Sequence, residues 1–105
     1  MSETYVDSVL SGSTIWTDID DFIERWHETE GSESIEDFLG MTEDDYSLLV
    51  EEPRSLRFIL AAHESHESVA ELLESADAHA IAARGLDPAD AEKVRHWLRE
   101  TGRLT

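Results

Sequence analysis

The chain has 105 residues, which is enough for one small domain with a single hydrophobic core. Hydrophobic residues make up 40% of it, a share typical of folded chains and too high for a disordered one. The formal net charge of -17 excludes binding to nucleic acid or to an anionic membrane through the surface as a whole, because both need cationic patches. The same charge favours basic partners.

The location follows from what the sequence lacks. It contains no cysteine, so disulfides and thiolate chemistry are excluded. The first ten residues, MSETYVDSVL, have neither the basic region nor the long apolar stretch of a secretory signal, and no apolar run is long enough for a membrane span. We therefore expect a cytoplasmic protein that does not contact a membrane.

The charge is unevenly distributed along the chain. Residues 84–105 hold five of the eight cationic side chains and four acidic ones, a net charge of +1, whereas residues 1–83 carry -18. We expect a single helical domain over residues 1–105, with an acidic body (1–83) and a near-neutral, Arg-containing C-terminal helix (84–105). An acid load of this size also fits an ordinary domain from a high-salt organism.

Apolar residues recur at helical spacing and no stretch alternates as a strand does, which predicts an all-α fold. A short helix is expected over residues 4–10. The next helix is expected to start at Thr17 as N-cap, with Asp20 at the capping-box position. Its apolar stripe consists of Ile19, Phe22, Ile23 and Trp26.

The segment SIEDFLGMTEDDYSLLVEEP, residues 34–53, has the outline of a helix-turn-helix. Ser34 caps a first helix that stops at Gly40, and Thr42 caps a second that stops at Pro53. The expected buried stripes are Ile35, Phe38 and Leu39 in the first helix, then Tyr46, Leu49 and Val50 in the second.

Helical punctuation continues to the end of the chain. Ser55 is expected to cap the next helix, and Ser68 with Glu71 forms a capping-box pattern, so residues 55–84 are either one bent helix or two. Asp87 and Pro88 begin the last helix. Its expected inward residues are Ala91, Val94, Trp97 and Leu98. Together the patterns predict a compact bundle of five to seven short helices, including the helix-turn-helix-like pair.

Catalytic and metal-binding patterns are weak. In HESHE, His63 and His66 stand three residues apart, whereas a zincin helix needs them four apart with a Glu directly after the first, and no third ligand is marked. No nucleophile elbow or phosphate loop occurs. We predict no metal, no cofactor and no enzymatic activity.

The second helix of residues 34–53 is acidic where a DNA reader would carry Arg and Lys, so it is not expected to read DNA. Either its outer face is simply hydrated, or its carboxylates occupy a basic groove in a partner. Trp16 and Tyr46 are candidate apolar anchors. The complete candidate contact is Glu43, Asp44, Asp45, Tyr46, Glu51, Glu52 and Trp16.

The same segment resembles small prokaryotic antitoxins and defence-cassette proteins that share an FLGMT-x3-Y core. The matching residues are Phe38, Leu39, Gly40, Met41, Thr42, Tyr46, Val50 and Pro53. The resemblance covers about the first half of the chain, and Leu49 stands where those proteins usually have an aromatic residue. It implies a protein that captures a toxin, and antitoxins often bind operator DNA as well.

The C-terminal helix offers a different contact. Four cations there could touch DNA phosphates or an acidic partner, better in a homodimer, or could pair with the acidic body. They are Lys93, Arg95, Arg99 and Arg103. Our leading expectation is a non-enzymatic acidic protein that neutralises a basic partner, most simply an antitoxin. The alternatives are a phage or mobile-element nucleic-acid mimic that inhibits a host defence protein, and a transcription regulator that uses the C-terminal helix.

Overall fold

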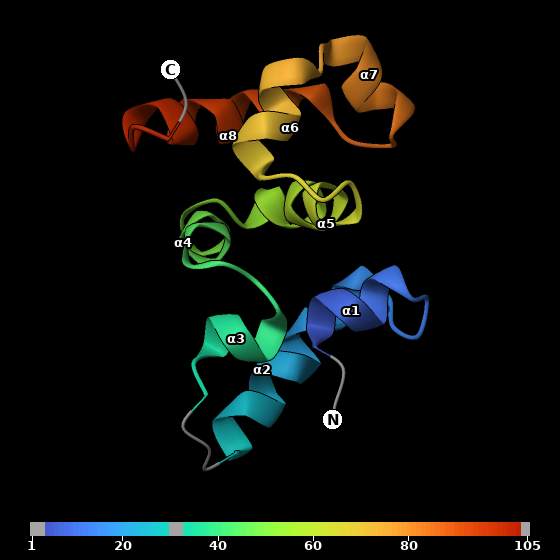
Figure 1. Cartoon of the computed structure of the whole chain (residues 1–105), viewed down its shortest axis with the longest axis vertical. Helices are drawn as coiled ribbons and strands as arrows, with labels where there is room; N and C mark the ends of the chain where they lie inside the picture. The colour runs from blue at the N-terminus through green and yellow to red at the C-terminus, as the bar shows by residue number, and fades with distance from the viewer. Residues whose placement is uncertain (1–3, 30–32, 104–105) are drawn as a thin grey trace. The chain divides into compact units, whose positions relative to one another are not determined.

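The computed structural model describes residues 4–29 and 33–103, and within them all regular secondary structure is helical (Figure 1). The all-α prediction is confirmed. These residues form eight α-helices and two 3-10 helices, more than the five to seven helices expected. Their bounds are α1 Tyr5–Leu10, η1 Trp16–Asp18, α2 Ile19–Glu28, α3 Ile35–Leu39, α4 Glu43–Glu51, η2 Pro53–Ser55, α5 Leu56–Glu64, α6 Val69–Ser75, α7 Ala78–Ala83 and α8 Pro88–Glu100.

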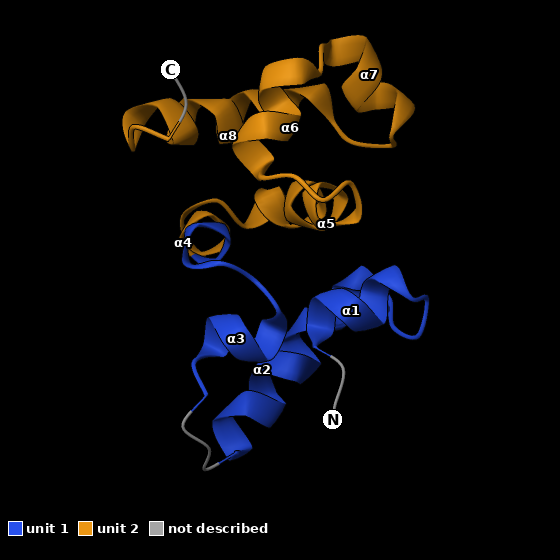
Figure 2. Cartoon of the chain, viewed as in Figure 1, with its two compact units in different colours: residues 1–46 blue, residues 47–105 orange. Residues whose placement is uncertain are grey.

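The chain divides into two compact units, residues 1–46 and residues 47–105 (Figure 2). The division falls inside α4, between Tyr46 and Ser47, and not near Arg84 where the charge changes along the sequence. The single domain of residues 1–105 stays a prediction.

Unit 1, residues 1–46, is built on α1, α2 and α3. The expected first helix is confirmed: Thr4 caps α1, and its hydroxyl accepts a hydrogen bond from the Asp7 backbone N–H. The buried ring of Tyr5 meets the buried ring of Phe22 edge-on, with 5.4 Å between centroids. This aromatic pair joins α1 to α2.

The FLGMT residues form the junction between α3 and α4. Gly40 has the left-handed φ of 81° that a non-glycine residue rarely adopts, and its N–H bonds the Asp37 carbonyl while the Met41 N–H bonds the Glu36 carbonyl. A Cβ on Gly40 would lie 2.5 Å from Thr4 Oγ1, so glycine also lets α3 approach the cap of α1. The motif therefore has a structural explanation in the turn itself.

Unit 2, residues 47–105, holds most of the apolar core. Helices α5 and α6 contact each other, and α8 contacts α6, α7 and η2. An ion pair of 3.3 Å between Arg54 and Asp90 links η2 to α8, and Arg84 Nη1 donates to Ser65 Oγ at 3.2 Å. The buried apolar residues of this unit are Leu48, Leu56, Phe58, Ile59, Leu60, Ala62, Val69, Leu72, Leu73, Ile81, Leu86, Ala91, Val94 and Leu98.

The segment over residues 55–84 is three helices, whereas one or two were expected. After α5 the backbone turns through His66, which has a φ of 58°, and the predicted Ser68–Glu71 capping box then starts α6. Asp77 caps α7 by accepting a hydrogen bond of 2.8 Å from the Ala80 N–H. This second cap begins a new helix within the Ala-rich segment, so α6 and α7 are separate helices and not one continuous helix.

Three local expectations are wrong. Thr17 does not cap α2, because it lies inside the 3-10 turn η1, and α2 begins at Ile19 without a side-chain cap. The Tyr5 hydroxyl donates a hydrogen bond to the Trp16 carbonyl at the start of this turn. Ser55 does not cap α5 with its side chain. Val50 is exposed, because α4 buries the opposite face that carries Leu48.

Candidate partner-binding surface

The negative charge is concentrated in unit 1. Its 46 residues contain 14 Asp and Glu, one Arg and no Lys, a net charge of -13, whereas the other 59 residues contain 11 acids and seven cations, a net charge of -4. The single Arg25 lies over the Phe22 ring at 4.9 Å from its centroid. One Arg and one His cannot neutralise 14 carboxylates, so the unit presents a strongly negative surface of its own.

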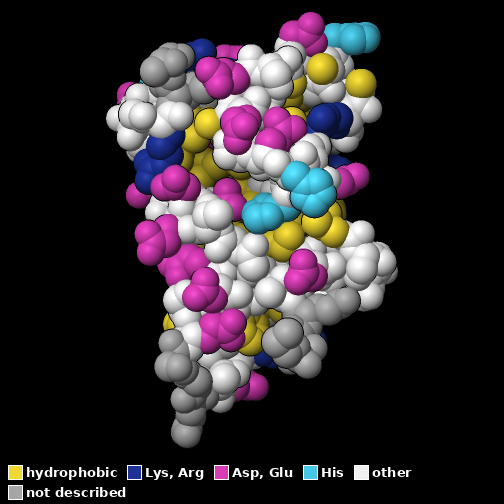
Figure 3. Space-filling model, in the orientation of Figure 1, with side chains coloured by type: hydrophobic (Ala, Val, Ile, Leu, Met, Phe, Trp, Pro, Cys, Tyr) yellow, Lys and Arg dark blue, Asp and Glu magenta, His cyan; other side chains and the backbone are white. Residues whose placement is uncertain are grey.

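Figure 3 shows one face of the molecule coloured by residue type, with Asp and Glu side chains recurring across it. Among the described acids of unit 1, most are exposed. They are Asp7, Asp20, Asp21, Glu24, Glu28, Glu33, Asp37, Glu43 and Asp44. Their exposure leaves these carboxylates accessible to a partner.

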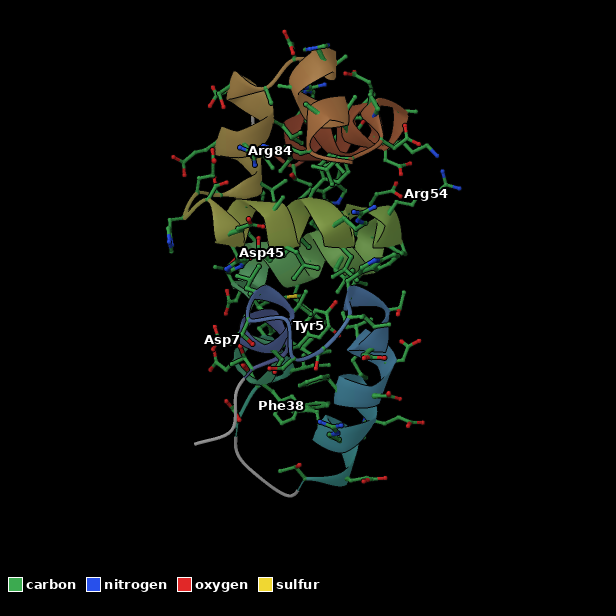
Figure 4. The ribbon with its side chains drawn as sticks, turned by 90° about the vertical axis from the view of Figure 1, so that its right-hand side faces the viewer. Tyr5, Asp7, Phe38, Asp45, Arg54 and Arg84 are labelled. Atoms are coloured by element: carbon green, nitrogen blue, oxygen red, sulfur yellow. The ribbon has the colours of Figure 1, made fainter. Side chains whose placement is uncertain are left out.

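At the start of α4 the predicted acidic contact separates into two groups. Asp45, which Figure 4 labels, is buried and completes a cap. Thr42 Oγ1 accepts from the Asp45 N–H at 3.0 Å, and Asp45 Oδ2 accepts from the Thr42 N–H at 3.3 Å. Glu43 and Asp44 are exposed in the same first turn, where the helix dipole also favours negative charge. Asp45 therefore holds the helix start, and the accessible carboxylates here are Glu43 and Asp44.

The remaining α4 candidates lie in different surroundings. Glu51 is exposed, whereas Glu52 and Tyr46 are half-buried. Val50, expected in the core, has 60% of its surface exposed. Helical spacing places Glu43, Ser47, Val50 and Glu51 on one face of α4. Val50 is not part of the predicted contact, which on this face of α4 consists of Glu43 and Glu51.

Helix α2 carries an acidic stripe that the sequence reasoning missed. Asp20, Glu24 and Glu28 follow one another at four-residue steps, and Asp21 lies within the same 100° arc of the helix. All four are exposed. The spacing is readable in the sequence, in which the apolar stripe on the other face of this helix is the stronger pattern.

Trp16 is 43% exposed, and its neighbour Ile15 is 65% exposed. The backbone beneath them is anchored, because the Tyr5 hydroxyl donates a hydrogen bond to the Trp16 carbonyl. Burial, together with the nearby charge of Asp18, raises the pKa of Tyr5 well above its usual range, so this hydroxyl remains a donor at neutral pH. Trp16 is therefore exposed on an anchored backbone, and its role as an apolar anchor stays a prediction.

The four C-terminal cations do not form one surface. Arg95 donates to the Leu73 carbonyl at 3.2 Å and to the Ala76 carbonyl at 2.7 Å, and its side chain is only 14% exposed. It therefore ties α8 to the C-terminal end of α6. Arg103 lies over the Trp97 ring, 4.8 Å from its centroid. Lys93 and Arg99 are exposed beside Glu92, His96 and Glu100, so the outer face of α8 carries mixed charge.

The two histidines of the HESHE segment lie on either side of the end of α5. His63 lies in the last turn of α5 and His66 in the following turn with a left-handed backbone, so the two do not share a helix face. Across the described residues, no group of three or more His, Cys, Asp or Glu side chains is arranged to hold a metal ion.

Comparison of the chain with models of known protein families, with curated proteins and with solved structures finds no match. The antitoxin-like resemblance of the FLGMT segment therefore stays a prediction. In the described part of the chain, no helix has both the length and the apolar character needed to cross a membrane.

Proposed function

We propose that this chain is a non-enzymatic acidic protein that binds and neutralises a basic partner in the cytoplasm, as an antitoxin does its toxin. The observation that carries the proposal is the charge of unit 1, -13 over 46 residues with a single Arg. Such a surface attracts a cationic partner over long range and repels nucleic acid and anionic lipid. The accessible contacts are Glu43 and Asp44 of α4 and the acidic stripe of α2, defined as Asp20, Asp21, Glu24 and Glu28.

A second candidate, a nucleic-acid mimic that inhibits a defence protein, is favoured by the geometry of the acidic stripe. From Asp20 to Glu28 the helix axis rises about 12 Å, and the steps between successive charges are uneven, about 1.5, 4.5 and 6 Å, with a mean of about 4 Å. One strand of DNA carries a charge about every 3.4 Å of axis. A basic groove made for a nucleic-acid backbone could accept such a stripe. Both candidates use the same surface and differ in the identity of the partner.

The transcription-regulator alternative has weaker support. One of its four predicted contacts, Arg95, is engaged with the backbone of α6, and the exposed Lys93 and Arg99 lie among acidic side chains. A variant with Lys93→Glu and Arg99→Glu tests this alternative on exposed positions. We expect this variant and the wild-type chain to show the same affinity for DNA.

The main experiment is a tagged pull-down from the source cell at low and high salt, with the recovered proteins identified by mass spectrometry. We expect one stoichiometric basic protein that is lost at high salt, and its own activity should fall on adding the purified chain. A toxin encoded beside this gene would identify an antitoxin, whereas a host nuclease would identify a mimic. Recovery of a specific DNA fragment without protein would overturn the proposal.

Charge-neutralised variants then locate the contact. Glu43→Gln with Asp44→Asn, and Asp20→Asn with Glu24→Gln, should each weaken binding of the recovered partner by about tenfold or more. The matched control is Glu64→Gln with Glu74→Gln, which removes the same charge from exposed positions of unit 2. Equal weakening by all three variants would mean that only net charge matters and that no defined surface exists.

A further inference from the structure

Among the residues that the structure describes, three of the four exposed large hydrophobic side chains lie in one seven-residue stretch of unit 1. They are Leu10 at 41% exposed, Ile15 at 65% and Trp16 at 43%, and we call them the unit 1 apolar patch. Single exposed hydrophobic residues are ordinary on protein surfaces, whereas several of them on one short segment favour a site of association.

The segment that carries the patch is ordered by contacts with α1. After Ser11 the chain folds back, so that the N–H groups of Ser13 and Thr14 donate to the Ser8 carbonyl at 2.9 and 3.2 Å. Two residues later the Trp16 carbonyl accepts the Tyr5 hydroxyl. Ile15 therefore lies between two anchored points, and its side chain is exposed on a fixed backbone, which reduces the entropy lost on binding.

Negative charge borders the apolar patch along the chain. Asp18 follows in η1, and Asp20 and Asp21 begin α2. The one cation of this unit, Arg25, lies over the Phe22 ring. The unit 1 apolar patch is therefore an apolar surface with negatively charged side chains next to it in the chain.

The charge determines which occupant fits. An anionic lipid surface or a nucleic acid would be repelled, and a second copy of this chain would bring another -13 against the first. A cationic, amphipathic segment satisfies both halves of the surface, with apolar side chains on the patch and Lys or Arg beside the carboxylates. We propose that the unit 1 apolar patch docks such a segment of the basic partner. This inference rests on the proposed function and adds the site and the chemistry of the bound segment.

The test compares two defined cationic probes on the full chain, a helical Leu/Lys peptide with one apolar face and an oligolysine of equal charge, by fluorescence anisotropy at low salt. We expect the Leu/Lys peptide to bind at least about tenfold more tightly than oligolysine, since Ile15 and Trp16 bury apolar surface only against the amphipathic probe. Ile15→Ser with Trp16→Ser should remove that difference and leave oligolysine binding unchanged.

Val50→Ser is the matched control for the single variant Ile15→Ser, because both remove an aliphatic side chain of similar exposure. The Ile15 variant should weaken the Leu/Lys peptide several-fold and the Val50 variant less than about twofold. Three results would overturn the inference: an unchanged preference of the double variant for the Leu/Lys peptide, equal losses of peptide affinity in the Ile15 and Val50 variants, or self-association of the wild type that the double variant abolishes. Each of them would leave oligolysine binding intact, and with it the charge argument. Failure of both probes to bind would overturn the inference and the proposed function together.

Discussion

At the scale of single residues, glycine at position 40 is required by both backbone and space. Its φ of 81° strains any residue with a Cβ, and that Cβ would lie 2.5 Å from Thr4 Oγ1. Gly12 has nearly the same φ, 83°, but nothing lies within 4 Å of its Cβ position, which makes it the control in the same unit. We expect Gly12→Ala to lower the free energy of unfolding by about 1–2 kcal/mol and Gly40→Ala by clearly more, as measured by urea denaturation. Equal losses would show that Thr4 does not restrict this turn.

Ser55 and Ser68 look alike in sequence, each standing before a helix, but their hydroxyls differ. The Ser68 Oγ accepts a hydrogen bond from the Glu71 N–H, whereas the Ser55 Oγ is buried and has no partner among the described residues. Because an unsatisfied buried hydroxyl costs free energy, Ser55→Ala should raise the free energy of unfolding by about 1 kcal/mol, as measured by thermal denaturation. Ser68→Ala should lower it by a similar amount. A loss of stability in Ser55→Ala would contradict this view of the site.

At the scale of the elements, Arg95 connects two helices of unit 2. It donates to the carbonyls of Leu73 and Ala76 and pairs with Glu92, so Arg95→Met should lower the free energy of unfolding by about 2–3 kcal/mol. Arg99→Met, at an exposed position of the same helix, should change it by less than about 0.5 kcal/mol. Guanidinium denaturation followed by circular dichroism measures both. Similar effects in the two variants would argue against a structural role for Arg95.

At the scale of the whole molecule, the net charge of -17 predicts a salt dependence of folding. Like charges oppose the compact state, and the Debye length falls from about 30 Å at 0.01 M salt to about 8 Å at 0.15 M, so added NaCl should stabilise the chain within this range. Unit 1 should gain more than unit 2, because it holds -13 of the charge. About 1 kcal/mol of stabilisation corresponds to a rise of about 4–8 °C in Tm.

Tryptophan fluorescence separates the two units in that measurement. A Trp97→Phe variant reports only unit 1, through Trp16 and Trp26, and a Trp16→Phe, Trp26→Phe variant reports only unit 2. Screening predicts a gain that is nearly complete by about 0.2 M NaCl. A gain that continues into the molar range would instead indicate the domain of a high-salt organism, in which the acidity serves solvation and not a partner.

The sequence by itself determined the helical class, most of the caps and the excess of acid, because these depend on local spacing and on composition. Ser34, Thr42, Ser68 and Asp87 cap helices through interactions within a few residues. The FLGMT turn was predictable for the same reason, since the left-handed backbone that ends α3 favours glycine at position 40.

Only the tertiary structure decided which faces of those helices, and which charged side chains on them, are buried. Asp45 and Asp44 are neighbours of one residue type, yet one completes a buried cap and the other is exposed. Arg95 differs from Arg99 because α6 ends beside it, and Trp16 is held by a hydroxyl eleven residues earlier in the chain. Contacts between distant segments set the register of each helix, and local propensity does not contain that information.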